Sequence, residues 1–316
     1  MMVGVMDVVR DPESPIGARG AVVTIGAYDG VHRGHQAVLR LVRDLATARD
    51  LDAVVCTFAT HPAYVVRPDS APKLLTSLDQ KLELLAATGN VDRTVVLTFD
   101  DIRAGESAEA FVRDTLVAQL GAQVIVVGSD FHFGKGRTGN VALLDDLGTD
   151  LGFEAVGTNL VAAEHEIISS TRIRALLGDG DVRGAADLLG RPHELRGVVI
   201  EGDKRGRELG FPTANVALAP ELCLPADGIY AGTFVGADGV ERMTAINLGR
   251  RPTFYDAQEY SLLEAHVLDF DGDLYGQEVA VRFIERLRGE QKFDSVDALI
   301  AQMGRDCEQA RTILAG

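Results

Sequence analysis

GAYDGVHRGH, residues 26–35, follows directly after the apolar run AVVTI at residues 21–25 and precedes a stretch with helical spacing of apolar residues. An apolar run that ends in glycine and leads into a helix is typical of a buried parallel strand with a ligand at its carboxyl end. The HxGH core places two imidazoles and a glycine where the N–H groups of a helix N-terminus point outward. This segment predicts a phosphate site at the edge of a parallel sheet.

Strand-like and helix-like segments alternate from this point to about residue 190. Further strands are expected at residues 53–58, 94–99, 124–127 and 153–156, and helices at residues 36–49, 78–87 and 108–120. Continuous apolar strands between helices predict a parallel sheet covered on both faces, which is an α/β, Rossmann-like fold.

The pattern changes after about residue 191, where short β-rich runs are interrupted by Gly, Pro or Asp. Runs at residues 229–235, 243–246 and 278–284 without helices between them predict an antiparallel barrel or sandwich. Residues 297–314 predict one closing amphipathic helix. In a chain of 316 residues we therefore expect a first domain over residues 1–188 and a second over residues 189–316.

Composition excludes several classes of partner. The formal net charge is −16, from 31 Lys and Arg against 47 Asp and Glu, whereas nucleic acid is bound by clustered Lys and Arg. No apolar stretch approaches the about 18 residues of a membrane span. Cys56, Cys223 and Cys307 show no CxxC spacing, which disfavours a zinc site and a disulfide framework. We expect no nucleic-acid or membrane partner and a reducing compartment, the cytoplasm.

A second phosphate element is expected at ISSTRIR, residues 168–174, before another helical stretch. Ser170 and Thr171 could form an ordinary helix N-cap. Arg174 shares a helix face with Thr171, so hydroxyls and guanidinium could instead clamp a phosphate chain. The candidates for this first site are His32, His35 and Arg174 as catalytic residues and Gly26, Gly34, Ser170 and Thr171 as phosphate-binding residues.

The segment VGSDFHFGKGRTG at residues 127–139 contains a formal GxGxxG. It follows the fourth expected strand and not the first, so it does not indicate a dinucleotide fold. Lys135 is followed by Gly136, so there is no Walker A motif. Phe131 and Phe133 are either core residues or contacts to a ligand.

A third element, GRELGFPTAN at residues 206–215, opens the last third of the chain. Pro212 fixes the backbone before Thr213, and residues two apart on a strand point to the same side. Thr213 and Asn215 would then offer hard oxygen ligands that suit Mg²⁺ beside phosphates. The alternative is a loop that enters a strand with its polar side chains in water.

Four later segments resemble riboflavin kinases in order and spacing. NLGRRPTF, EAHVLDF, DLYG and FIERLR, at residues 247–254, 264–270, 273–276 and 283–288, resemble the NIGxxPTF, ExHxLDF, DLYG and FIxxLR motifs, and residues 206–215 resemble the ATP and metal loop. The first half resembles the HxGH nucleotidyltransferases, with the VGxDFxFGxxRxG loop of bacterial FMN adenylyltransferases. Ala27 and Tyr28 depart from the usual Asn-Phe, and FATHP at residues 58–62 departs from FxPHP.

The whole chain thus resembles the bacterial bifunctional riboflavin kinases/FMN adenylyltransferases, or FAD synthetases. The resemblance implies a six-stranded barrel in which Glu264 is the general base for phosphorylation of riboflavin to FMN, with Mg²⁺ on Thr213 and Asn215. It also implies that the α/β half adenylylates FMN with ATP to FAD and pyrophosphate. The positions assigned to ATP in the barrel are Gly197, Gly206 and Gly210, and those assigned to flavin and adenosine are Asp130, Phe131, Phe133 and Arg137.

Three alternatives stay open at this point. One half could serve only as a flavin-binding scaffold, or the chain could be a flavin sensor without ATP turnover. Adenylylation of a nicotinamide or pantetheine nucleotide shares HxGH but leaves residues 191–316 unexplained. We expect His132, His165 and His193 to be surface or structural residues. The sequence does not decide the oligomeric state, and a weak homo-oligomer stays open.

Overall fold

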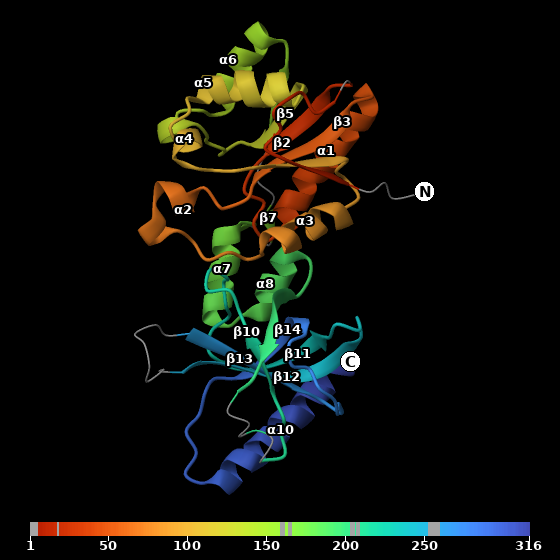
Figure 1. Cartoon of the computed structure of the whole chain (residues 1–316), viewed down its shortest axis with the longest axis vertical. Coiled ribbons are helices and arrows are strands. Elements are labelled where there is room, and N and C mark those ends of the chain that lie inside the picture. The colour runs from red at the N-terminus through yellow and green to blue at the C-terminus, as the bar shows by residue number, and fades with distance from the viewer. Residues whose placement is uncertain are drawn as a thin grey trace. The chain divides into compact units, whose positions relative to one another are not determined.

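The computed structural model describes residues 6–17, 19–158, 162–163, 166–202, 206, 209–251 and 260–316. The chain divides into two compact units (Figure 1). The first holds Met1–Pro72 and Ser77–Ser169, and the second holds Lys73–Thr76 and Ser170–Gly316. The second unit therefore includes two helices that precede the expected boundary at residue 189. That boundary stays a prediction.

A six-stranded parallel sheet forms the centre of the first unit, with its strands in the order β1-β4-β3-β2-β5-β6. The strands are β1 (Asp7–Arg10), β2 (Ala21–Ile25), β3 (Asp52–Phe58), β4 (Arg93–Leu97), β5 (Ala122–Gly128) and β6 (Glu154–Thr158). The strand order reverses at β2, which pairs with β3 on one side and β5 on the other. Open α/β sheets bind ligands at the carboxyl ends beside such a switch point. The predicted α/β class is confirmed.

Helices cover both faces of this sheet. They are α1 (Arg33–Arg49), α2 (Ala63–Val66), α3 (Leu78–Ala87), α4 (Asp101–Ala104), α5 (Ala108–Ala110) and α6 (Val141–Leu151), with the 3₁₀ turns η1 (Pro68–Ser70) and η3 (Lys135–Arg137) and the π-helical η2 (Phe111–Gln119). Val22 and Val55 face α1 and α3, whereas Val23 and Val54 face η2 and α6. β7 (Ala162–Ala163) and β8 (Glu166–Ile167) form a separate antiparallel pair.

A closed antiparallel barrel, in the order β10-β13-β12-β11-β14-β9, forms the second unit. Its strands are β9 (His193–Ile200), β10 (Ala214–Ala217), β11 (Gly228–Val235), β12 (Glu241–Arg251), β13 (Tyr260–Val267) and β14 (Glu278–Arg288), and its helices are α7 (Ser170–Asp179), α8 (Val182–Leu189) and α10 (Val296–Leu314). The predicted barrel and closing helix are confirmed.

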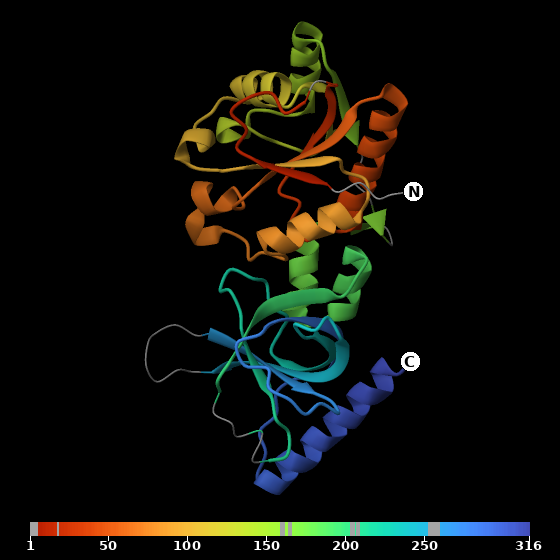
Figure 2. The same cartoon turned by 45° about the vertical axis from the view of Figure 1, so that its right-hand side comes forward.

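Alternate residues of the barrel strands face opposite sides of its wall. On β13, Leu263, Ala265 and Val267 are buried inside, and Glu264 and His266 between them lie on the outer wall. Helix α10 covers part of that outer wall (Figure 2), where the small Ala231 and Ala245 let it approach closely. The strand alternation thus brings Glu264 to the surface that α10 borders.

Four residues from the middle of the first unit's sequence belong to the second unit. Leu74 pairs in parallel with Leu222. Its N–H donates to the carbonyl of Glu221 at 2.7 Å, and its own carbonyl accepts from Cys223 N–H at 2.7 Å. Lys73 Nζ adds a bond to the carbonyl of Pro220 at 2.6 Å. The segment Lys73–Thr76 is therefore a short edge element of the second unit.

A buried ion pair joins α10 to the barrel. Arg288 of β14 donates to the carboxylate of Asp306 through Nε at 3.0 and 3.1 Å and through Nη2 at 2.7 Å. Gln302 donates to the same carboxylate at 2.8 Å. The side chains of Arg288 and Asp306 are only 15% and 6% exposed, so neither charge can turn to water if the other is removed.

Replacing Asp306 by Ala should therefore lower the free energy of unfolding of the second unit by about 3–5 kcal/mol, because the guanidinium stays buried without its partner. Urea unfolding followed by circular dichroism measures the loss. The control is Asp269→Asn, which breaks an exposed ion pair to Arg311 and should shift the midpoint much less. Equal midpoints for the two variants would contradict a structural role for the buried pair.

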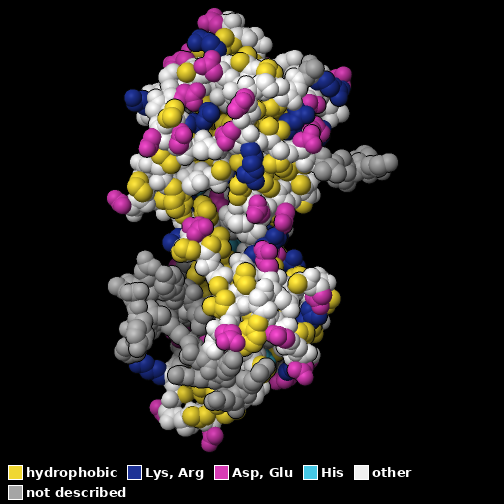
Figure 3. All heavy atoms as spheres, in the orientation of Figure 1, with side chains coloured by type: hydrophobic (Ala, Val, Ile, Leu, Met, Phe, Trp, Pro, Cys, Tyr) yellow, Lys and Arg dark blue, Asp and Glu magenta, His cyan; other side chains and the backbone are white. Residues whose placement is uncertain are grey.

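Charged side chains are mixed on the surface. On the face shown in Figure 3, acidic and basic side chains are interspersed over both units. Among the helices that the structure describes, none combines the length and the apolar character needed to cross a bilayer. Cys56, Cys223 and Cys307 are all buried free thiols.

Candidate active sites

The HxGH histidines lie at the N-terminus of α1, beside the switch point of the sheet. His32 is the N-cap residue, and its Nδ1 accepts a hydrogen bond from the His35 N–H at 3.3 Å. The two imidazole rings are stacked with centroids 3.6 Å apart. Because Nδ1 of His32 accepts, the neutral ring carries its proton on Nε2 and presents a donor there.

His35 is held in the neutral form. Burial lowers its pKa well below the ordinary value of 6.5, and the neighbouring His32 and Lys81 lower that pKa further. Its buried Nδ1 has no hydrogen-bond partner among the described residues. A buried nitrogen without a partner is costly unless a ligand or water meets it. The pair therefore fits a site for a polar ligand at a helix N-terminus.

The loop that leads to His32 has a constrained backbone. Tyr28, Gly30 and Val31 adopt φ angles of 51°, 81° and 40°, and a β-branched residue such as Val31 is rarely found there. The Tyr28 hydroxyl lies 2.7 Å from that of Thr24, and Gln36 Nε2 donates to the Val31 carbonyl at 2.9 Å. These contacts hold Gly26 and Gly34 of the predicted phosphate site at the two ends of one fixed turn.

The segment at residues 128–139 leaves the carboxyl end of β5, next to β2. Phe133 belongs to the buried core, and Phe131 is stacked on it at 5.6 Å, half-buried at the core's margin. Phe133 N–H and C=O pair with Gly139 at 3.1 and 2.9 Å, which closes the loop. Asp130 and Arg137 are exposed. Phe133 thus has a packing role, and Phe131 is the more exposed of the two rings; its contact with a ligand stays a prediction.

Ser170, Thr171 and Arg174 begin helix α7, which belongs to the second unit. Arg174 Nε donates to the carbonyl of Lys73 at 2.5 Å. Within the first unit, a Cβ on Gly34 would lie 3.4 Å from the carbonyl oxygen of Ile168. The chain therefore passes Gly34 just before it reaches Ser169, and the phosphate clamp itself stays a prediction.

Glu264 stands between two asparagines on the outer wall of the barrel. The strand register places Asn215 of β10 opposite Glu264 on one side and Asn247 of β12 opposite it on the other. Asn247 Nδ2 donates to Glu264 Oε2 at 3.3 Å. Residues directly opposite in antiparallel strands point to the same face, so the three polar side chains form one row across three strands.

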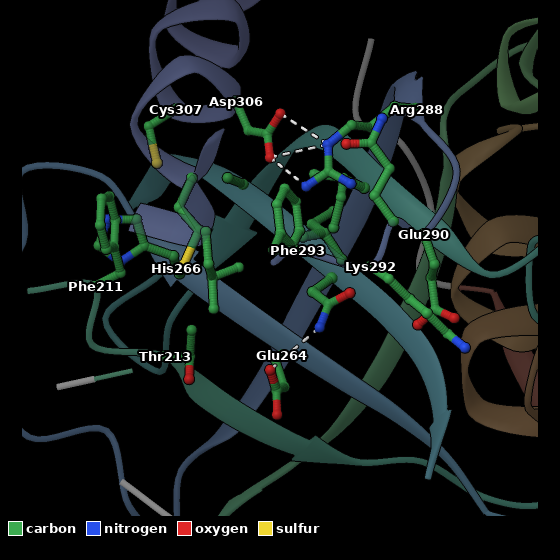
Figure 4. A pocket seen from close by; sticks show the side chains of 17 residues that line it. Phe211, Thr213, Glu264, His266, Arg288, Glu290, Lys292, Phe293, Asp306 and Cys307 are labelled. Atoms are coloured by element: carbon green, nitrogen blue, oxygen red, sulfur yellow. Dashed lines mark hydrogen bonds and ion pairs between the residues drawn. The ribbon is translucent and has the colours of Figure 1, made fainter. Parts of the chain in front are cut away.

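Glu264 and Asn247 of this row line a cavity of about 570 Å³ between the barrel wall, α10 and the segment at residues 290–293 (Figure 4). Its apolar lining comes from Phe211, Ile229, Ala245, Ile246, Phe293, Leu299 and Met303. Glu264, Thr213 and His266 lie along one side of the view, and the Arg288–Asp306 pair lies across from them. A cavity of this size with an apolar lining and a few convergent polar groups is typical of a small-molecule site.

Two contacts to backbone carbonyls and one close approach define the loop that leads to the predicted metal ligands. Phe211 N–H donates back to the Gly206 carbonyl at 2.8 Å, and His266 Nδ1 lies 2.7 Å from the Pro212 carbonyl. A Cβ on Gly202 would lie 2.1 Å from Asn215 Nδ2. The glycine therefore allows this loop to pass directly over the amide of Asn215.

The glycines predicted to bind ATP in the barrel unit have different surroundings. Gly206 closes the turn to Phe211, and Gly210 has a φ of 87° and is exposed. Gly197 lies on β9, where a Cβ would lie 2.1 Å from the Ala217 carbonyl of β10. Gly197 is thus a site of close strand approach. The predicted positions Arg207, Glu208 and residues 252–254, and also His165, lie outside the described residues.

Two residues near these sites, Asn247 and Lys81, were given no role from the sequence. Asn247 follows from the strand register alone, and Lys81 reaches the HxGH loop from α3. His193 is buried, with Nε2 3.0 Å from the Cys223 carbonyl, as expected for a structural histidine. His132 is exposed.

The chain matches two family models. The model described as FAD synthetase matches residues 15–172, and the model described as riboflavin kinase matches residues 189–314. A Streptococcus pneumoniae crystal structure, described as a macrolide-efflux protein, has a TM-score of 0.86 and 32% identity, and the match covers 97% of this chain and 99% of that one.

Full-length relatives carry both halves. The Escherichia coli K12 protein called bifunctional riboflavin kinase/FMN adenylyltransferase is 39% identical over 292 residues, which is 92% of each chain. The Bacillus subtilis protein of the same name is 35% identical over 293 residues, 92% of this chain and 91% of its own. The two family models and these relatives together cover both halves of the chain. The chain belongs to the family of bifunctional riboflavin kinases/FMN adenylyltransferases.

Proposed function

We propose that the barrel unit phosphorylates riboflavin to FMN with ATP, and that the HxGH site then adenylylates FMN to FAD with release of pyrophosphate. The observation that carries this proposal is the position of Glu264. Its carboxylate lies between Asn215 and Asn247 and faces a cavity of about 570 Å³ with an apolar lining. The cavity has the size and character that a flavin ring needs.

In the first step Glu264 accepts the proton of the riboflavin 5′-hydroxyl while that oxygen attacks the γ-phosphorus of ATP, and ADP leaves. Asn247, which donates to Glu264 Oε2, fixes the orientation of the carboxylate. The other carboxylate oxygen then faces the substrate. Gly206 and Gly210 bring the loop backbone toward the phosphates of ATP.

In the second step an oxygen of the FMN phosphate attacks the α-phosphorus of ATP, and pyrophosphate leaves. His32 and His35, with the N–H groups that begin α1, stabilise the charge that builds up on the phosphate oxygens. Ser170, Thr171 and Arg174 hold the outgoing phosphates. No covalent enzyme intermediate is needed, because positioning and charge stabilisation are enough. Asp130, Phe131 and Arg137 contact flavin and adenosine, with Phe133 supporting the ring of Phe131.

Thr213 and Asn215 would hold Mg²⁺ in the barrel unit. Their side-chain oxygens suit this ion, which binds few protein groups and takes substrate phosphates and waters as its other ligands. Among the described residues no group of three or more His, Cys, Asp or Glu could hold a metal ion. When bound, Mg²⁺ would offset the negative charge of ATP.

Replacing Thr213 by Val should raise the Mg²⁺ concentration that half-saturates the kinase reaction by at least about tenfold, because the hydroxyl ligand is lost without a change in shape. Magnesium titration of FMN formation measures this. The control is Thr233→Val in the same barrel, whose hydroxyl is buried without a partner among the described residues. An unchanged magnesium dependence in the Thr213→Val variant would remove Thr213 from the metal site.

A time course with riboflavin, ATP and Mg²⁺, with the flavins separated by chromatography, tests the complete proposal. We expect FMN to rise first and then to convert to FAD. FMN without FAD would leave the first unit as a scaffold. FAD from supplied FMN, but no product from riboflavin, would place the failure in the barrel, and no turnover of either flavin would favour a flavin sensor.

We place both reactions in the cytoplasm, because three buried free thiols suit a reducing compartment. Neither reaction as proposed requires a second chain. A weak homo-oligomer, if formed, would be detected by light scattering at rising concentration in the presence of FMN and ATP.

A further inference from the structure

Lys81 is a buried cation for which the two proposed reactions give no role. It lies on α3 with only 8% of its surface exposed. Its Nζ donates to the carbonyl of Phe58 at 2.8 Å, and to the carbonyl of Ala27 and the hydroxyl of Thr57, each at 3.2 Å. An ammonium group has three protons, and these three acceptors engage all of them. Burial of an ammonium group is costly. A lysine that is buried in this way is therefore expected to have a structural or functional role.

All three acceptors lie at the carboxyl ends of β2 and β3. Thr57 also donates to the Ala27 carbonyl at 3.2 Å, so Lys81, Thr57 and Ala27 form a closed set of hydrogen bonds. The Ala27 carbonyl thus receives two donors from two different elements. Lys81 thereby fastens the beginning of the HxGH segment to the neighbouring strand.

The backbone just beyond Ala27 needs such an anchor. Tyr28 and Val31 have φ angles of 51° and 40°, and such residues persist only where their surroundings hold them. Tyr28 is anchored by its hydroxyl to Thr24, and its ring lies 4.8 Å from that of His35. A displacement of the backbone at Ala27 would therefore move Tyr28 and, through the contact between the two rings, His35.

The charge of Lys81 also acts on His35. Lys81 lowers the pKa of His35, in the same direction as burial and His32. The negative charge of Asp29, in the HxGH loop, favours the charged form of Lys81. In its charged form Lys81 thus disfavours protonation of His35.

We propose that Lys81 is a positioning residue of the adenylyl-transfer site, which holds the 26–35 segment, and with it His35, through the Ala27 carbonyl. The proposal rests on the assignment of FMN adenylylation to this site. Lys81 acts through Ala27 and His35, since its own protons are committed to protein acceptors.

The pH dependence follows from the protonation of Lys81. Burial lowers its pKa from 10.5 to about 8, and Asp29 opposes this shift. Above that pH the neutral amine has two protons for three acceptors, so adenylylation should fall as the pH rises through about 8. The free energy of unfolding changes in the opposite direction. The pKa of Lys81 is lower in the folded state than in the unfolded state, so the unfolded chain binds more protons at pH values between the two. The contribution of Lys81 to the free energy of unfolding therefore rises with pH in that range.

The test compares Lys81→Met, which keeps the length but loses the charge, with Lys81→Arg, which keeps the charge. FAD formation from supplied FMN is measured from pH 6 to pH 10, and FMN formation from riboflavin serves as the reference in the same samples. We expect Lys81→Met to lower the kcat of adenylylation at least tenfold, to leave the KM for FMN and the kinase rate unchanged, and to lose the decline above pH 8. The control Arg40→Met removes an exposed cation from α1 and should keep the wild-type profile.

A second readout does not depend on turnover. Imidazole NMR resonances are titrated in the wild type and in both Lys81 variants, and the His35 signal is identified by its absence from His35→Gln. We expect the pKa of His35 to rise toward 6.5 in Lys81→Met and to stay low in Lys81→Arg. Lost activity with an unchanged pH profile and an unchanged His35 titration would reduce Lys81 to a packing residue and overturn the proposal.

The two assignments fail in different ways. If the wild-type chain makes no FAD from FMN while the kinase reaction proceeds, the function proposed for the first unit is wrong, and the His35 titration still decides the role of Lys81. If wild-type FAD formation is normal and Lys81→Met matches it at every pH, the inference about Lys81 alone is wrong.

Discussion

Replacing Glu264 by Gln is expected to lower the rate of FMN formation by about 10²–10⁴-fold, the usual contribution of a general base, while supplied FMN is still converted to FAD at the wild-type rate. The substitution keeps the size of the side chain and a carbonyl oxygen that can accept from Asn247 Nδ2. It removes only the basic oxygen that would take the proton of the 5′-hydroxyl. The loss should therefore appear in kcat and not in the KM for riboflavin.

Steady-state assays of both reactions on one preparation measure this effect. The control is Glu278→Gln, an exposed carboxylate at the start of β14, which should leave both rates unchanged. Kinase activity that survives in Glu264→Gln would show that the base lies elsewhere. Loss of both reactions would instead indicate that the variant is misfolded, which its circular dichroism spectrum would reveal.

Replacing His35 by Ala should lower FAD formation from FMN by about 10²–10³-fold, as for the loss of one donor to a developing oxyanion, and should spare the kinase. The ring stacks on His32 at 3.6 Å, and the alanine variant keeps the backbone N–H of residue 35 that donates to His32 Nδ1. Because the pKa of His35 lies well below 6.5, His35 is already neutral at pH 6.5. Wild-type adenylylation should consequently show no acid limb from this residue between pH 6.5 and pH 8.

The control for this variant is His132→Ala, which removes an exposed imidazole of the same unit. Both reactions are followed by chromatography of the flavins. FAD formation at the wild-type rate in His35→Ala would remove this histidine from the adenylyl-transfer site. Equal loss of the kinase reaction would argue against two separate sites.

The strands whose apolar runs were continuous could be read from the sequence. β2, β3 and β5 were expected close to their observed bounds because all or nearly all of their residues are buried. β1 escaped prediction because Asp7–Arg10 is mostly exposed at the sheet edge and shows no apolar run. Helix α6 contains Gly148, a poor helix former, but a Cβ there would lie 2.5 Å from the Phe153 carbonyl. Tertiary packing overrides local propensity at that position.

The candidate sites were predictable where one short motif carries the chemistry. His32 and His35 are three residues apart on a helix start, and Glu264 stands in a recognisable string. The partners of Glu264 were not predictable as a row, because Asn215 and Asn247 reach it only through the barrel register. The role of Lys81 could not be predicted either. A single lysine in a helical pattern is ordinarily a surface residue, and its acceptors come from distant parts of the sequence.

The segment Lys73–Thr76 affects how the second unit can be produced as a separate fragment. A fragment that begins at residue 189 would lack the backbone partner of Glu221 and Cys223, which each share a bond of 2.7 Å with Leu74. The carbonyl of Glu221 and the N–H of Cys223 would then form an open strand edge, and open edges are a known template for self-association. The second unit is therefore built from two separate stretches of chain. A soluble fragment of the kinase half would need residues 73–76 fused to it or added as a separate peptide.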